Sequence, residues 1–77
     1  MSPTIIRTKN LRIRVYPKDH DPAHVHVTAP NAEAKIRLSD CKAYFSKGFT
    51  KMALSRIEIF IEQHKEILLK AWHEYQK

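Results

Sequence analysis

A chain of 77 residues is long enough for one small domain, here residues 1–77, and its hydrophobic content of 43% is that of a globular protein. No apolar run reaches the roughly 20 residues of a membrane span, and the single cysteine excludes an internal disulfide, so we expect a cytoplasmic protein. The formal net charge of +6 favours polyanions or an acidic protein as partners.

The first half of the chain alternates apolar and polar residues in three segments, at residues 11–16, 23–29 and 33–38. This alternation is typical of strands that bury one face and expose the other. Proline, aspartate and asparagine between the segments favour turns. The pattern predicts an antiparallel meander of three strands, and a short fourth strand over residues 41–45 is left open.

From about residue 50 the apolar period changes to 3.6 residues, which predicts one long helix over about residues 50–75 with Thr50 as its N-cap. His64 lies in the apolar arc of this helix, and we expect it to be a buried, hydrogen-bonded core residue. The predicted fold class is therefore α+β: a three- or four-stranded antiparallel sheet with the long C-terminal helix packed on its apolar face.

The polar positions of the three strands should share the other face of the sheet. They are Arg12, Arg14, His24, His26, Lys35 and Arg37. Like charges directly opposite one another destabilise a sheet, so we expect a ligand or partner to compensate; the alternative is a solvated cationic face with no specific ligand. Tyr16 is the one aromatic side chain expected here, whereas sheets that stack single-stranded RNA use two or three rings. The expected binding residues are Arg12, Arg14, Tyr16, Lys35 and Arg37.

Residues 19–27 read DHDPAHVHV and contain three histidines. His24 and His26 are two apart in a predicted strand, so their rings should point to the same side, and His20 lies in the connector before them. One interpretation is a metal-independent nuclease or phosphodiesterase, with His24 and His26 as the acid–base pair and His20 in support. Another is a divalent metal site, such as zinc, with His20, His24 and His26 as ligands. The structural alternative is a turn residue at His20 and cross-strand packing at the other two.

Two nearby arginines, Arg12 and Arg14, would repel a divalent cation, so we expect no cofactor as the first interpretation and zinc or another divalent metal as the second. Whether the protein is an enzyme is left open by the residues themselves.

Taken together, these segments resemble an uncharacterised bacterial family, the domain of unknown function 4160. The resemblance is carried by RIRVY at residues 12–16, by DHDPAHVHV at residues 19–27, and by the helix ending with Leu68 and Trp72. The chain departs from the family pattern at Ala23, where many members have a second proline. The resemblance implies a small stand-alone protein, often encoded beside another small domain in an arrangement similar to a toxin–antitoxin pair.

We therefore expect a small basic interaction protein, a component of a toxin–antitoxin-like pair, that uses its cationic His/Arg face. The expected partner is an acidic protein, such as the adjacent-gene product, or RNA or DNA. No membrane is expected as a partner, and a second copy of the chain is left open as one. The histidine nuclease and the metal binder are the alternative functions.

Overall fold

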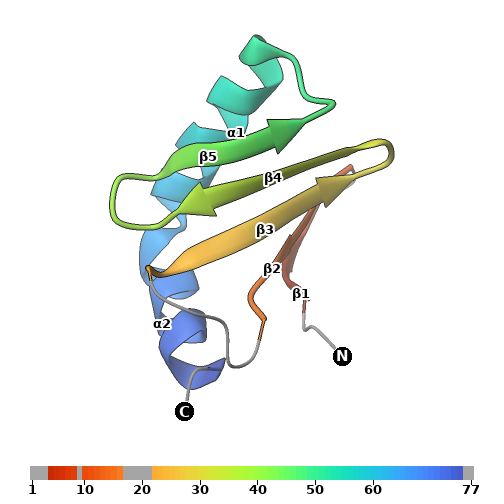
Figure 1. Ribbon diagram of the computed structural model, residues 1–77. Coiled ribbons are helices and arrows are strands. Elements are labelled where there is room, and N and C mark those ends of the chain that lie inside the picture. The colour runs from red at the N-terminus through yellow and green to blue at the C-terminus, as the bar shows by residue number, and fades with distance from the viewer. Residues whose placement is uncertain (1–3, 9, 17–21, 76–77) are drawn as a thin grey trace.

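Five strands and two helices form this computed structural model, which describes residues 4–8, 10–16 and 22–75 (Figure 1). The elements are β1 (Thr4–Arg7), β2 (Arg12–Arg14), β3 (His24–Ala29), β4 (Ala32–Arg37), β5 (Lys42–Lys47), α1 (Lys51–Gln63) and α2 (Lys65–Tyr75). The strands pair antiparallel in the order β1-β2-β3-β4-β5, and both helices lie behind the sheet in Figure 1. The α+β class and the antiparallel meander are thus confirmed.

The sheet is larger than predicted, because it has five strands rather than three or four. β2, β3 and β4 overlap the predicted segments, although β2 has only three residues, and β5 overlaps the fourth strand that was left open at residues 41–45. β1 was not predicted.

Both edge strands contain a register shift, which hides their alternation from the sequence. In β1 the shift lies between Thr4 and Ile6, and both Ile5 and Ile6 pack against the core. In β5, Phe45 lies opposite Lys35 and Ala43 lies opposite Ile36, so Tyr44 is the extra residue. A bulge of this kind places two residues opposite one and breaks the period of two.

The core lies between the sheet and the helices, as the alternation predicted. Odd-numbered residues of β2 and β3 and even-numbered residues of β4 point into it, together with one side of both helices. The largest fully buried side chains are Ile13, Val15, Val25, Val27, Ile36, Leu38, Ile61 and Leu68. Burial of such side chains is worth about 1.5–3 kcal/mol each relative to exposure.

The predicted single helix is divided at His64, which corrects the prediction of one long helix. The backbone of His64 has φ −115° and ψ 16°, and its N–H donates to the Ile61 carbonyl over three residues. Its ring Nδ1 lies 2.8 Å from the Phe60 carbonyl, so the imidazole donates to an oxygen that the helical N–H would otherwise use. His64 is half-buried and hydrogen-bonded, with its ring 4.3 Å from that of Phe60. Thr50 is the N-cap, as predicted, and its hydroxyl accepts from the Ala53 N–H.

Two turns determine how the end of the sheet closes. β3 and β4 are joined through Pro30 and Asn31, where Asn31 has φ 67°, a conformation that asparagine tolerates. Gly48 has φ +89° and follows β5; a Cβ on it would lie 2.4 Å from the Asn31 carbonyl oxygen. Only glycine fits this position, and it brings β5 and the β3–β4 turn together.

Within the described residues, neither helix combines the length and the apolar composition needed to cross a membrane.

Candidate functional site

The polar side chains of the sheet align in three rows across the strands. The end row contains Arg7, Arg12, Thr28, Glu33 and Lys47, the middle row Thr4, Arg14, His26, Lys35 and Phe45, and the third row His24, Arg37 and Lys42. We call these residues, with Tyr16 and Tyr44, the polar face. The register places all six predicted residues of the cationic face on this one side, so the predicted strand parity is confirmed.

Positive charge dominates this face. Glu33 contributes a carboxylate in the end row, and Arg37 forms an exposed ion pair with Asp40 at 3.2 Å. Lys42 lies 3.9 Å from Glu58 of α1. Among the described residues, no carboxylate pairs with the remaining cations of the polar face. Cations on neighbouring strands repel one another, so binding of an anion to this face would be electrostatically favourable.

Aromatic rings lie beside these cations, which corrects the expectation that Tyr16 is the one ring here. Tyr44 and Phe45 are 46% and 40% exposed, although both are large and partly apolar. The Lys35 ammonium lies 5.5 Å from the Phe45 ring centre, and the Arg37 guanidinium lies 5.7 Å from that of Tyr44. The face therefore combines rings and cations at cation–π distance.

The bulge in β5 explains why the sequence interpretation missed Tyr44 and Phe45. Strict alternation would send one of two adjacent side chains into the core, whereas the bulge leaves both exposed. The adjacent aromatic pair in a segment of low apolar content was the available signal.

A shallow depression of about 50 Å³ lies in the middle of the face. Tyr16, His26, Lys35 and Phe45 contribute to its lining. The His26 ring is half-buried and contacts the Tyr16 ring edge-to-face, with 4.3 Å between ring centres. His26 is thus the imidazole that borders the depression.

His24 points to the same side of the sheet as His26 but is covered. Its side chain is 2% exposed, its Nδ1 donates to the Pro22 carbonyl at 2.7 Å, and its ring lies 5.1 Å from that of Trp72. Pairing of β2 with β3 ends at Arg14 and His26, so Trp72 of α2 reaches the ring of His24 beyond the end of β2. The expectation that both imidazoles lie open on the face is wrong for His24.

The predicted three-histidine cluster is only partly described. His24 and His26 are adjacent, with ring centres 5.1 Å apart, whereas His20 lies outside the described residues. Within the described part of the chain, no three His, Cys, Asp or Glu side chains gather in a way that could hold a metal ion.

Cys41 lies in the turn before β5 and is buried. Burial raises the pKa of its thiol above the ordinary value, so the group is a neutral thiol at neutral pH. It is a packed side chain and not an activated nucleophile.

Residues 10–73 match the model of a protein family described as a domain of unknown function, DUF4160. No curated protein and no solved structure matches the chain.

Proposed function

The chain belongs to the DUF4160 family, a domain of unknown function, and from the geometry of its polar face we propose that it binds single-stranded nucleic acid. The observation that carries this proposal is the pairing of exposed rings with cations on one side of the sheet, at Tyr44 beside Arg37 and at Phe45 beside Lys35.

The cations of the face suit a phosphate backbone. Arg12 and Arg14 lie on β2, and Lys35 and Arg37 lie on β4, with β3 between them. Strands in a sheet are about 4.8 Å apart, so the backbones of β2 and β4 are separated by roughly 10 Å, a distance that a few nucleotides of a flexible strand can span. Each neutralised phosphate releases counterions, which favours binding at low salt.

The rings of the face suit unpaired bases. Base stacking on an aromatic side chain contributes about 1–3 kcal/mol per base and is independent of sequence. Bases of a duplex are already stacked on one another and cannot lie flat on Tyr44 or Phe45. The polar face therefore favours single strands over duplexes.

An acidic protein, the other partner expected from the charge, would be attracted by the same cations but would not need two exposed rings beside them. The pairing with an adjacent-gene product stays a prediction of the family resemblance. Burial of His24 favours binding over hydrolysis, because an acid–base pair needs both imidazoles at the same phosphate and His24 is covered by Trp72.

The test is a salt titration with a fluorescein-labelled single-stranded oligonucleotide, followed by fluorescence anisotropy. Affinity should fall with ionic strength with a log–log slope of about −0.7 per phosphate contacted. Replacing Arg12 and Arg14 together with Gln should make that slope shallower by about 1.4, because two phosphate contacts are lost.

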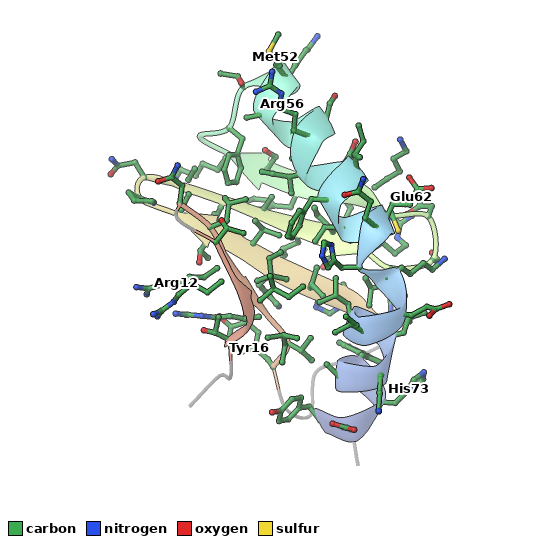
Figure 2. All side chains as sticks on the ribbon, turned by 180° about the vertical axis from the view of Figure 1, so that it is seen from behind. Arg12, Tyr16, Met52, Arg56, Glu62 and His73 are labelled. Carbon is green, nitrogen blue, oxygen red and sulfur yellow. The ribbon has the colours of Figure 1, made fainter. Side chains whose placement is uncertain are left out.

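Arg56→Gln combined with Lys51→Gln is the matched control, because both residues are exposed cations on α1 and their replacement removes two charges without touching the polar face. Figure 2, seen from the helix side, shows Arg56 and Met52 at the start of α1, well separated from Arg12 and Tyr16. Equal loss in the control and in the Arg12/Arg14 variant would reduce the effect to net charge and contradict the proposal. If an acidic protein binds this face and oligonucleotides do not, the proposal of nucleic-acid binding is overturned in favour of a protein partner.

A further inference from the structure

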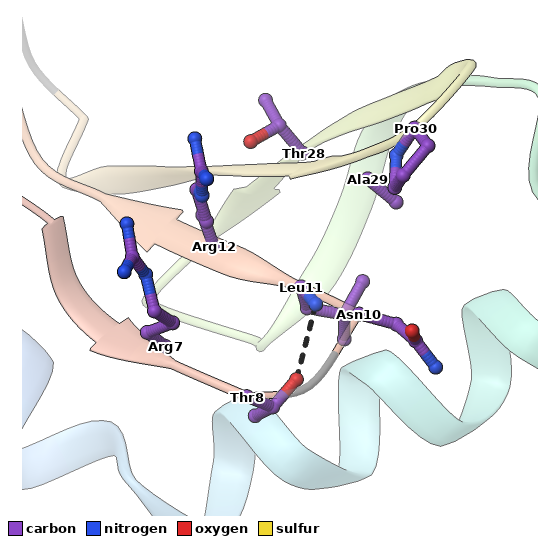
Figure 3. A pocket seen from close by; sticks show the side chains of 8 residues that line it. All are labelled: Arg7, Thr8, Asn10, Leu11, Arg12, Thr28, Ala29 and Pro30. Carbon is purple, nitrogen blue, oxygen red and sulfur yellow. Dashed lines mark hydrogen bonds between the residues drawn. The ribbon is translucent and has the colours of Figure 1, made fainter.

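A hollow lined in part by the end row of the polar face lies at the end of the sheet, next to the β1–β2 hairpin. It measures about 500 Å³, within the roughly 300–1,000 Å³ range of small-molecule sites. Arg7 and Arg12 line it from β1 and β2, Thr28 lines it from β3, and residues of the two adjoining turns, among them Leu11 and Pro30, form the rest of the wall (Figure 3).

Two arginine side chains lie side by side in this pocket. Arg7 and Arg12 are register partners on neighbouring strands, and Thr28 is the register partner of Arg12 on the next strand. Figure 3 shows these three side chains rising to the same side of the sheet. Both arginines are exposed, and within the described part of the chain no carboxylate pairs with either guanidinium.

The donor set of this pocket is that of an anion site. The Arg7 and Arg12 guanidiniums and the Thr28 hydroxyl can all donate hydrogen bonds, and the described residues of the lining include no Asp or Glu. Like charges directly opposite in a sheet are destabilising, and an anion bound between them removes that repulsion. A guanidinium fork matches the oxygen spacing of a phosphate and can bind it through two parallel hydrogen bonds.

Charge and size distinguish a terminal phosphate from an internal one. A phosphate monoester carries about −1.5 to −2 at pH 7, which two guanidiniums balance, whereas an internal diester carries only one charge. The pocket is larger than a phosphate alone, and Leu11 and Pro30 add apolar wall for the attached sugar. Because Arg7, Arg12 and Thr28 belong both to this pocket and to the end row of the polar face, a strand crossing the face can place its end here.

We infer that the pocket at Arg7, Arg12 and Thr28 binds the terminal phosphate monoester of a single strand. This inference rests on the proposed function, binding of a single strand to the polar face, and adds that the pocket holds the end of that strand. Arg7 is the pocket residue chosen for the test, because β1 and β5 are the opposite edges of the sheet and Arg7 thus lies away from the rings of β5.

The experiment compares four oligonucleotides of one sequence, carrying a 5′-phosphate, a 5′-hydroxyl, a 3′-phosphate or a 3′-hydroxyl. One phosphorylated end should bind roughly tenfold or more tightly than its hydroxyl counterpart, as expected for added hydrogen bonds between charged groups. Comparison of the 5′ pair with the 3′ pair of oligonucleotides shows which end of the strand enters the pocket. Arg7→Gln should abolish this preference, so that the phosphorylated and hydroxyl-ended strands bind the variant with the same affinity.

A second measurement uses the shift in melting temperature with adenosine monophosphate, against adenosine as the control ligand. The monophosphate should stabilise the unmodified protein and the Arg56→Gln control, but not Arg7→Gln or Thr28→Val. Circular dichroism of each variant without ligand checks that it is folded, and Arg7→Lys should restore part of the shift because it restores the charge.

The outcomes separate the two proposals. Hydroxyl-ended strands that bind, with no preference for a phosphate end and no effect of Arg7→Gln, would overturn the pocket and keep the proposed function. Monophosphate stabilisation that depends on Arg7, without binding of any hydroxyl-ended strand, would keep the phosphate pocket and overturn the proposed function.

Discussion

His24 and His26 point to the same side of the sheet, yet their surroundings give them different roles. The His24 ring lies between Trp72 and Tyr44 and donates to the Pro22 carbonyl, so it joins the start of β3 to α2. His26 borders the open depression beside Tyr16. A buried side chain held on several sides contributes to stability, whereas a half-exposed one is available to a ligand.

We expect His24→Ala to lower the free energy of unfolding by about 2–3 kcal/mol, since it removes a buried hydrogen bond and leaves a cavity beside Trp72. His26→Ala should cost about 1 kcal/mol or less, because its side chain is only half-buried. Urea denaturation followed by the fluorescence of Trp72, the only tryptophan in the chain, measures both. Equal losses in the two variants would contradict the structural role of His24.

The edge strand β5 depends on α1 for its position. The Glu58 carboxylate accepts the Ala43 N–H through Oε2 at 2.9 Å and lies 3.9 Å from the Lys42 ammonium through Oε1. Ala43 directly precedes the bulge that exposes Tyr44 and Phe45. One helical side chain therefore holds the strand that presents both rings.

Glu58→Ala should lower the free energy of unfolding by about 1–3 kcal/mol, because it leaves the part-buried Ala43 N–H without its acceptor. Glu58→Gln is the matched variant: its amide oxygen can still accept from Ala43, and it loses only a 3.9 Å ion pair with the exposed Lys42, worth about 1 kcal/mol or less. Hydrogen exchange of the Ala43 amide, measured by NMR, should accelerate in Glu58→Ala and change little in Glu58→Gln. Similar acceleration in both would assign the effect to charge instead of the hydrogen bond.

The two faces of the sheet differ in what covers them. The helices cover one face of the sheet and bury the apolar core, while the polar face remains open with its cations and rings. The strands and helices that build the core therefore leave the opposite face available for binding.

Single-strand affinity should fall about tenfold for Tyr44→Ala and for Phe45→Ala, because each loses a stacking surface, while the salt slope stays unchanged. Weak binding of a duplex of the same sequence should not respond to either change. Met52→Ala is the control, since Met52 is 67% exposed on α1, outside the polar face. Anisotropy titrations of each variant measure these effects; a change of slope in the ring variants would contradict a stacking role.

The predicted elements show which parts of the fold are encoded locally. Alternation within residues 11–16, 23–29 and 33–38 was sufficient to predict three strands and the side of the sheet to which Arg12, His24 and Arg37 point. Side-chain direction in a regular strand depends only on parity, so no distant contact is needed. Helical periodicity after Thr50 was likewise sufficient to predict helical structure and its buried side, but it did not reveal the break at His64.

Tertiary structure decided what depends on contacts between distant segments. The bulges in β1 and β5, the exposure of Tyr44 and Phe45, and the burial of His24 by Trp72 all follow from how separate elements meet. The opposition of Arg7 and Arg12 follows from the pairing of β1 with β2. Local pattern therefore determined the charge of the face, while packing determined which of its side chains a ligand can reach.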